Sequence, residues 1–285
     1  MIDYARYLLA KRRLDDRSLN HQVWLALDSY LRGSSGCQIL ELGAGVGTMV
    51  ERLQAAGLLT RADYTLLDGD GELLRLARER LGTDQQGTRL HYVATAFQDF
   101  LRQAPGKYDL IVAHSFLDLI DLPLLLPPLL ALLKPGAGFY FTLNFDGGTI
   151  LQPPVQPGLD EKIERLYHQT MDERLFQGAP AGDSQTGRHL PELLRQSGAA
   201  VTAAGSSDWV VLAGPDGYPD DEAYFLACIL DTMEMALRDR PELGVTEFAD
   251  WLGRRRQQLA SGELFYVAHQ LDYFGYRLKQ DPQKV

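Results

Sequence analysis

The stretch Ile39-Leu40-Glu41-Leu42-Gly43-Ala44-Gly45-Val46-Gly47-Thr48 is an apolar run that passes directly into a glycine-rich turn. This pattern predicts a buried strand, a tight turn and the start of a helix. Glycine adopts the positive φ angles that such a turn needs, and it lets a ligand approach the backbone closely. The N–H groups that open the next helix provide an anion site. We therefore expect this turn to hold a cofactor.

Two cofactor classes use such a turn, and the glycine spacing separates them. The dinucleotide pattern Gly-x-Gly-x-x-Gly requires a glycine where this chain has Thr48. Glu41 adds a carboxylate that would repel a pyrophosphate but suits a cationic amino group. The segment resembles the first motif of class I, Rossmann-like S-adenosylmethionine (SAM)-dependent methyltransferases. This resemblance implies a cofactor site at Glu41, Gly43, Ala44, Gly45 and Gly47.

A second predicted strand adds a further contact with the cofactor. The apolar run Tyr64–Leu67 ends at Asp68, 21 residues after Gly47. A carboxylate at the end of this strand is placed to accept both ribose hydroxyls, a feature that NAD-dependent enzymes share. The resemblance implies that Asp68 binds the ribose of SAM, with Gly69 beside it in the cofactor site.

Three more segments follow the order of this family. A third strand is predicted at Leu90–Ala94, and the resemblance implies adenine contacts after it, from Ala96 and Phe97, where many members have an acidic residue. The fourth strand begins with an aromatic-Asp pair and ends at His114, beside the methionine part of SAM. The passage Lys134-Pro135-Gly136-Ala137-Gly138 resembles the turn before the fifth strand, with Ala137 in place of a glycine.

The resemblance implies an α/β fold with a seven-stranded, mostly parallel sheet, helices on both faces and an antiparallel last strand. We expect an N-terminal helical extension or lid at residues 1–36 and a SAM-binding domain at residues 37–285. Helical insertions about 158–180 and 218–262 are expected to cap this domain. Gly147-Gly148 and the prolines that follow predict a loop or linker after the fifth strand.

Composition limits the partners and the location of the protein. A length of 285 residues with 45% hydrophobic content suffices for a large core. The net charge of −10 disfavours nucleic acid as a partner, because phosphate binding relies on Lys and Arg. Prolines interrupt the apolar stretch Leu122–Leu133, which is too short to cross a membrane. With two cysteines and no signal-peptide pattern, we expect a cytoplasmic protein, and a homodimer remains open.

The candidate catalytic group is His114, at the carboxyl end of the fourth strand. An imidazole suits proton transfer near neutral pH, so His114 is a candidate general base. The alternative is that His114 only lines the methionine pocket. Asp118 and Asp121 follow, and capping a helix is the favoured role for either.

Several residues are candidates for binding the methyl acceptor. The charged segment Lys11–Arg17 either folds over the cofactor or forms a solvated turn. Arg12 could pair with an acidic group of the acceptor, as could Arg13 and Arg188. Aromatic side chains in the segments above the cofactor suit a flat or cationic acceptor, although aromatic residues at helical spacing can equally be core. The acceptor candidates are Tyr4, Tyr7, Arg12, Phe116, Asn144 and Tyr167.

A magnesium site is an alternative, because some methyltransferases of the catechol type use acidic and amide residues after the fourth and fifth strands. Asn144 and Asp146 follow the fifth strand, but Ala113 or His114 occupies the position of the family's acidic ligand. We therefore expect no metal.

The combined pattern predicts transfer of a methyl group from SAM to a small-molecule acceptor by in-line displacement, with S-adenosyl-L-homocysteine as the second product. Holding the nucleophile in line and excluding water are the main tasks of such a protein. Two alternatives remain open: a SAM-binding or regulatory protein without transfer activity, and an NAD-dependent oxidoreductase.

Overall fold

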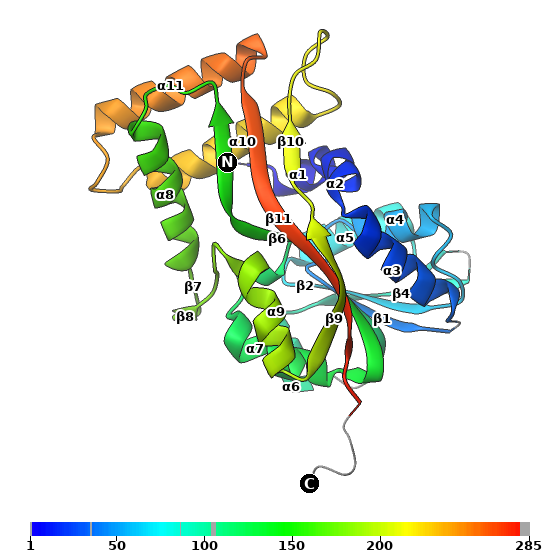
Figure 1. Ribbon diagram of the computed structural model, residues 1–285. Coiled ribbons are helices and arrows are strands. Elements are labelled where there is room, and N and C mark those ends of the chain that lie inside the picture. The colour runs from blue at the N-terminus through cyan, green and yellow to red at the C-terminus, as the bar shows by residue number, and fades with distance from the viewer. Residues whose placement is uncertain (1, 35, 86, 104–106, 280–285) are drawn as a thin grey trace.

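The computed structural model describes residues 2–34, 36–85, 87–103 and 107–279. It shows a twisted sheet with helices on both faces and a helical layer above one end of the sheet (Figure 1). Residue 1 and residues 280–285, at the outer ends of the two expected segments, lie outside the described residues, as do positions 35, 86 and 104–106.

The described residues 2–32 contain three helices, α1 (Tyr4–Ala10), α2 (Arg12–Ser18) and α3 (His21–Arg32). The side chain of Asp3 caps α1 by accepting from the Arg6 N–H, and Asn20 caps α3. Helix α3 buries Val23, Leu27 and Leu31 against the sheet. Only α1 and α2 therefore lie where a lid was expected, because α3 belongs to the core.

Within the described residues the sheet contains nine strands, whereas seven were predicted. Its order is β10-β11-β6-β5-β1-β2-β4-β3, with β9 also paired to β11. The central strands are parallel, and β11 runs antiparallel to β6, as predicted for the last strand. The strands are β1 (Gln38–Leu42), β2 (Asp63–Asp68), β3 (Asp84–Gln85), β4 (Thr88–Ala94), β5 (Tyr108–His114), β6 (Leu133–Gln152), β9 (Ala199–Ser206), β10 (Trp209–Val211) and β11 (Phe265–Arg277).

Two features account for the higher strand number. Strand β3 is a two-residue addition that pairs with the start of β4. In addition, two separate strands, β9 and β10, pair with successive parts of β11. At the break, the Ser207 N–H donates to the Gln270 carbonyl, close to register shifts in β11. A local irregularity in β11 therefore divides its neighbour without changing the sheet order.

Helices cover both faces of the parallel strands, so side chains on both faces are buried. Alternate residues of β1 and β5 pack into two different apolar clusters, one with α3, α4 and α5, and the other with α6, α7 and α9. The connecting helices are α4 (Thr48–Ala55), α5 (Gly71–Leu81), α6 (Phe97–Gln103), the 3-10 turn η1 (Leu117–Leu119), α7 (Leu122–Ala131) and α9 (Thr186–Gln196).

The loop predicted at Gly147-Gly148 is wrong, because β6 continues through these residues to Gln152. A Cβ atom at Gly148 would lie 2.8 Å from the Cβ of His269, so glycine permits β11 to approach closely here. The pairing of β6 with β11 is long, so these two strands extend beyond the parallel strands and reach the helical layer (Figure 1). The two glycines therefore extend the sheet instead of ending it.

The helical layer, hereafter the cap, packs on this extension of the sheet. Its helices are α8 (Leu159–Asp172), α10 (Glu222–Leu237) and α11 (Val245–Ser261). They form one apolar cluster with Phe145 and Leu151 of β6 and Tyr266 of β11. In the insertion expected about 158–180, α8 ends at Asp172, and β7 (Leu175–Phe176) and β8 (Ala179–Pro180) form a short hairpin after it.

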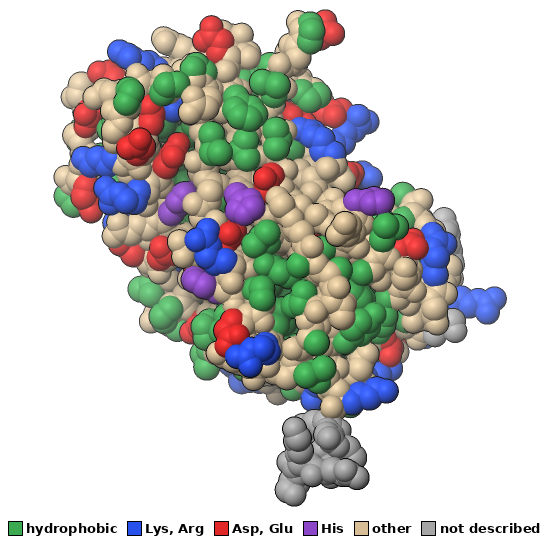
Figure 2. Space-filling model, viewed as in Figure 1, with side chains coloured by type: hydrophobic (Ala, Val, Ile, Leu, Met, Phe, Trp, Pro, Cys, Tyr) green, Lys and Arg blue, Asp and Glu red, His purple; other side chains and the backbone are tan. Residues whose placement is uncertain are grey.

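The opposite face of the extension is open. Figure 2 shows hydrophobic side chains gathered over the upper parts of β6, β11 and β10, where Ile150 and Val210 are each 46% exposed. Ile150 and Val210 both lie opposite Val267 in the strand pairing, so they form a row across the three strands. The cap therefore covers one face of the extension only.

Candidate functional site

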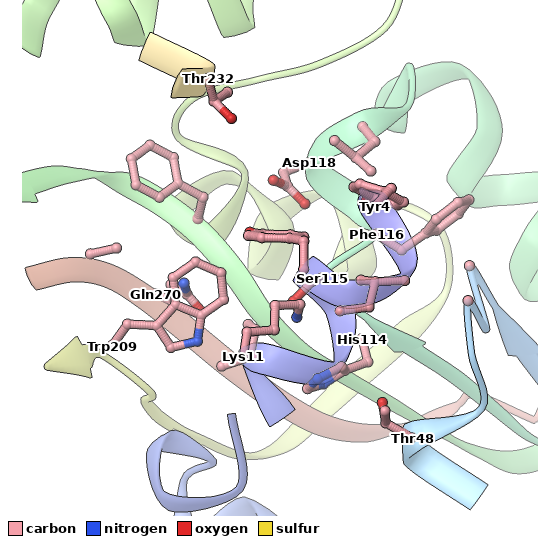
Figure 3. Close-up of a pocket in the computed structure, with 18 of the residues that line it drawn as sticks. Tyr4, Lys11, Thr48, His114, Ser115, Phe116, Asp118, Trp209, Thr232 and Gln270 are labelled. Atoms are coloured by element: carbon pink, nitrogen blue, oxygen red, sulfur yellow. The ribbon is translucent and has the colours of Figure 1, made fainter. Parts of the chain in front are cut away.

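A cavity of about 510 Å³ lies at the carboxyl ends of β1, β2 and β5, between the sheet and the cap. One half is formed by the glycine turn and the end of β2, which we call the cofactor half. It contains Glu41, Gly43, Ala44, Gly45, Val46, Thr48, Asp68, Gly69, Asp70 and Leu73. The other half, the acceptor half, is formed by α1, α8, α10, β6, β10 and β11, and includes Tyr7, Lys11, Phe145, Thr149, Tyr167, Trp209, Thr232, Tyr266 and Gln270 (Figure 3).

The backbone of the glycine turn has the conformation that the sequence predicts. Gly43, Gly45 and Gly47 have φ angles of +62°, +51° and +81°. A Cβ atom at Gly45 would lie 2.9 Å from Leu8 Cδ1, so α1 covers the turn directly. Gly47 does not line the cavity; it precedes α4, and a Cβ there would lie 2.5 Å from Leu81 Cδ1. The first two glycines therefore face the ligand space, and the third permits helix packing.

Asp68 lies at the end of β2 and faces the cavity, as predicted. Its Oδ2 accepts from the Gly45 N–H at 2.8 Å, and its Oδ1 accepts from the Asp70 N–H at 2.9 Å. Burial raises the pKa of Asp68, although these backbone donors oppose the shift. Each carboxylate oxygen has a further lone pair, so Asp68 fits two ribose hydroxyls.

Glu41 lies under the glycine turn and is 2% exposed. The Tyr64 hydroxyl donates to its Oε2 at 3.0 Å. Burial raises the pKa of Glu41 to about 8. The carboxyl group is therefore mostly neutral at neutral pH unless a cation binds beside it, which fits the predicted contact with an amino group.

A buried ionic cluster forms the floor between the two halves. Asp15 of α2 is 2% exposed and accepts from Lys11 Nζ at 2.7 Å and from Trp209 Nε1 at 2.9 Å. Arg52 Nη2 of α4 lies 3.7 Å from the same carboxylate. Burial opposes ionisation, but Lys11 and His114 hold the pKa of Asp15 below its ordinary value. The charged segment Lys11–Arg17 is thus folded into the site and is not a solvated turn.

His114 occupies the end of β5, and both of its ring nitrogens have protein partners. Nδ1 lies 2.9 Å from Thr142 Oγ1, and Nε2 lies 3.2 Å from Asp15 Oδ2 and 3.4 Å from Arg52 Nη1. Burial, followed by the charge of Arg52, lowers the pKa of His114 to about 4. This geometry supports the alternative in which His114 lines the cavity, because it offers no free nitrogen as a general base.

Other predicted residues are divided between the cavity and its surroundings. Tyr4, Tyr7, Phe116 and Tyr167 line the cavity. Six other predicted residues are not among its lining residues, including Arg188 and Arg13, whose Nη1 pairs with Asp220 Oδ1 at 2.7 Å. Arg12 Nη1 pairs with Glu51 Oε2 at 2.9 Å, and Asn144 Nδ2 donates to the Leu271 carbonyl. Phe97 packs edge-on against Phe116, and Ala96 directly precedes α6.

The two aspartates after β5 have different roles. Asp121 caps α7 by accepting from the Leu124 N–H, as predicted. Asp118 does not cap that helix but lines the cavity, and its Oδ1 is buried without a hydrogen-bond partner within the described residues. Sequence reasoning also missed Lys11, Ser115, Trp209 and Gln270 as lining residues. The spacing of Leu8, Lys11 and Asp15 along one helical face was the available signal.

No metal site is evident in the part of the chain that the structure describes, because no three His, Cys, Asp or Glu side chains are suitably grouped. Asp146, the alternative magnesium ligand, accepts from Arg188 Nε at 2.8 Å and from the Arg188 N–H. No helix among the described residues is long and apolar enough to cross a membrane.

The mostly parallel sheet, the antiparallel last strand and the cavity beside the glycine turn define a class I methyltransferase fold. Residues 40–139 match the family described as a methyltransferase domain. This segment of the chain is therefore similar to methyltransferase domains.

Curated relatives match the same part of the chain. The ubiquinone biosynthesis O-methyltransferase of Vibrio parahaemolyticus is 32% identical over 114 residues, which are 39% of this chain and 46% of the relative. The enzyme of that name from Bordetella pertussis is 30% identical over 112 residues, which are 39% of this chain and 44% of the relative. The chain thus spans less than half the length of these relatives.

Matches among solved structures include a SAM-dependent methyltransferase from Thiobacillus denitrificans in complex with S-adenosyl-L-homocysteine. Its TM-score is 0.46 at 16% identity, with 90% of this chain and 92% of that chain covered. A SAM-dependent methyltransferase from Geobacter sulfurreducens has a TM-score of 0.45 at 16% identity, with 90% and 91% covered.

Proposed function

We propose that this protein transfers a methyl group from SAM to a small-molecule acceptor. The observation that supports this proposal is a single cavity in which Glu41 and Asp68 flank the glycine turn and an aromatic half lies opposite. The cavity volume of about 510 Å³ is in the range of small-molecule sites. The net charge of −10 disfavours nucleic acid as the acceptor.

The residues of the cofactor half fit SAM in three places. Asp68 would accept the ribose hydroxyls, and Glu41 would pair with the amino group. Gly43 and Gly45 line the cavity, and their lack of a Cβ atom lets Phe116 and Leu8 pack against the turn. When bound, SAM supplies a methyl group that its sulfonium already makes electrophilic. The chain then has to orient the acceptor in line and exclude water, which α1 and the cap can do.

The first test is calorimetric titration of the protein with SAM, S-adenosyl-L-homocysteine and NADH. We expect binding of the first two and none of NADH. Asp68→Ala should weaken SAM binding at least about tenfold, because it removes charged hydrogen-bond acceptors. Asp63→Ala is a matched control, since Asp63 lies at the other end of β2 and pairs with Arg89 at the surface.

Each alternative has its own outcome. Binding of NADH alone would favour an oxidoreductase, and no binding of any of these ligands would reject the proposal. SAM binding without release of S-adenosyl-L-homocysteine over a broad panel of acceptors would favour a binding protein without transfer activity. Homodimer formation and cytoplasmic location stay predictions, which light scattering and cell fractionation would check.

A further inference from the structure

The acceptor half contains a buried lysine ammonium that points into the cavity. Lys11 lies between α1 and α2, is 5% exposed and lines the cavity. In Figure 3, the Lys11 side chain ends beside Ser115, with Trp209 and Gln270 on one side and His114 below. The Nζ atom lies 2.7 Å from Asp15 Oδ2, 3.4 Å from Ser115 Oγ and 5.3 Å from the centre of the Trp209 ring.

The hydrogen-bond capacity of Lys11 exceeds what these contacts use. An ammonium has three N–H donors, and only the contact with Asp15 is short. The distance to Ser115 Oγ is at the long limit of a hydrogen bond, and the Trp209 ring offers only its π face. At least one ammonium N–H and the Ser115 hydroxyl are therefore available to a ligand in the cavity.

These two donors lie where the cofactor half meets the acceptor half. Lys11 follows Leu8 by one helical turn, and Leu8 packs over Gly45. Ser115 precedes Phe116, whose ring packs over Gly43. An acceptor atom held by both donors would lie next to the glycine turn, on the side where the methyl group must be delivered.

The surrounding charges favour an anionic oxygen over a protonated amine. Asp15 already accepts from Lys11 and Trp209 and also faces His114 and Arg52, so it has no capacity for a ligand cation. A ligand ammonium at this point would instead meet the positive charges of Lys11 and Arg52. Burial raises the pKa of Asp118, and Lys11 is among the charges that oppose this shift; Asp118 lies on the far side of Ser115 in Figure 3.

The walls of the acceptor half favour a flat, apolar body. Aromatic rings from five different elements line the acceptor half. The side-chain amide of Gln270 lines it too, and its Oε1 is buried without a hydrogen-bond partner among the described residues. Such an amide oxygen can accept a hydrogen bond from a second polar group on the ring. The wall residues are Tyr7, Phe145, Tyr167, Trp209, Tyr266 and Gln270.

We infer that the acceptor is an aromatic compound with an acidic hydroxyl, a phenol or an enol, whose oxygen binds as an anion between Lys11 Nζ and Ser115 Oγ. This inference rests on the proposed methyl transfer. The hydroxyl proton leaves to solvent as the oxygen binds. A lone pair of that oxygen forms the O–C bond to the methyl carbon while the C–S bond breaks, and its electron pair stays on sulfur. The products are the methyl ether and S-adenosyl-L-homocysteine.

The test uses para-nitrophenol as the probe, because its ionisation shifts its visible absorption. In the complex of the protein with S-adenosyl-L-homocysteine, we expect the ionisation constant of the bound phenol to rise at least about tenfold. Lys11→Gln keeps an N–H donor for Asp15 but removes the charge, and it should abolish the shift. Ser115→Ala leaves the Lys11–Asp15 pair in place and should reduce the shift by less.

Two controls isolate the charge of Lys11. Lys134→Gln removes a lysine that pairs with Asp109 at the opposite end of the sheet, and it should leave the shift unchanged. The methyl ether para-nitroanisole cannot ionise, so it should bind equally to the wild type and to Lys11→Gln. Circular dichroism and affinity for S-adenosyl-L-homocysteine report whether each variant is folded.

The outcomes separate this inference from the proposed function. Normal binding of S-adenosyl-L-homocysteine with no saturable para-nitrophenol shift in the wild type would overturn the inference alone. The same conclusion follows if folded Lys11→Gln shows the full shift, or if para-nitroanisole binds as tightly as para-nitrophenol. Failure of the wild type to bind SAM and S-adenosyl-L-homocysteine would reject the proposed function, and the inference with it.

Discussion

Asp15 Oδ2 lies 3.2 Å from His114 Nε2, although 99 positions separate the two residues in the chain. This contact joins α2 to the end of β5. Arg52 of α4 and Trp209 of β10 reach the same carboxylate, so four elements meet at one buried group. The N-terminal helices are therefore fixed to the floor of the cavity by charge, and they form part of the site.

Removing the Asp15 carboxylate should destabilise the protein strongly. Asp15→Ala removes the carboxylate that Lys11 and Arg52 share, so both positive charges stay buried without it. Breaking a buried pair in this way costs about 3–5 kcal/mol. Urea unfolding monitored by circular dichroism measures the change in the free energy of unfolding.

A matched control for Asp15→Ala is Asp231→Ala. Asp231 pairs with Arg256 at 2.8 Å, but both side chains are nearly half exposed. Such a pair contributes less than about 1 kcal/mol. Equal effects of the two substitutions would show that the buried cluster does not stabilise the fold.

His114 should make stability depend on pH between its ordinary pKa of 6.5 and its lowered pKa of about 4. The folded protein holds the ring neutral, whereas the unfolded chain protonates it below pH 6.5, so stability is lost as the pH falls through this window. The loss is on the order of 3 kcal/mol. His114→Gln should remove this dependence, as measured by urea unfolding at several pH values.

The comparison with the variant is needed because other groups act in the opposite direction. Burial raises the pKa of Glu41 to about 8 and that of Asp272 to about 6, so their neutral forms favour the folded state as the pH falls. The difference between the wild type and His114→Gln cancels these contributions. Parallel stability curves for the two proteins would contradict the assignment.

Local pattern predicted the parts of this fold whose neighbours are close in sequence. The fourth strand begins with the pair Tyr108-Asp109 and ends at His114 as predicted, α10 and α11 lie within the insertion expected about 218–262, and the glycine turn has the predicted backbone. Each is encoded by periodicity or by a residue with special φ preferences. The predicted ribose carboxylate, Asp68, also faces the cavity.

Features that depend on distant partners were not predicted. Gly147-Gly148 has the composition of a turn, but pairing with β11 makes it strand, and the pairing residues lie more than a hundred positions away. Lys11 and Asp15 have the composition of a solvated surface, and they are buried because His114 and Trp209 supply their partners. Burial of charge is decided by tertiary contacts that a local pattern does not contain.

The cap should depend on a second buried ion pair. Arg255 of α11 is fully buried, and its Nη2 lies 2.6 Å from Asp160 Oδ1, which also accepts from Trp251 Nε1. Arg255→Leu should destabilise the protein by about 3–5 kcal/mol, because it leaves the Asp160 carboxylate buried without its cation. Urea unfolding followed by tryptophan fluorescence measures this change. Arg254→Leu, one position earlier on an exposed face, should change stability by less than about 0.5 kcal/mol.

SAM binding should release a proton from Glu41. At neutral pH the carboxyl group of Glu41 is mostly protonated, since burial raises its pKa to about 8. An ammonium bound beside it lowers the pKa again, so binding should release up to about one proton. Calorimetric titrations in buffers of different ionisation enthalpy measure the number of protons released.

Glu41→Gln should abolish the proton release and weaken SAM binding at least about tenfold. The control is Glu79→Gln, because Glu79 is an exposed carboxylate that pairs with Arg75 on α5; this substitution should change neither the release nor the affinity. Normal SAM affinity without proton release in the wild type would place the amino group of SAM away from Glu41.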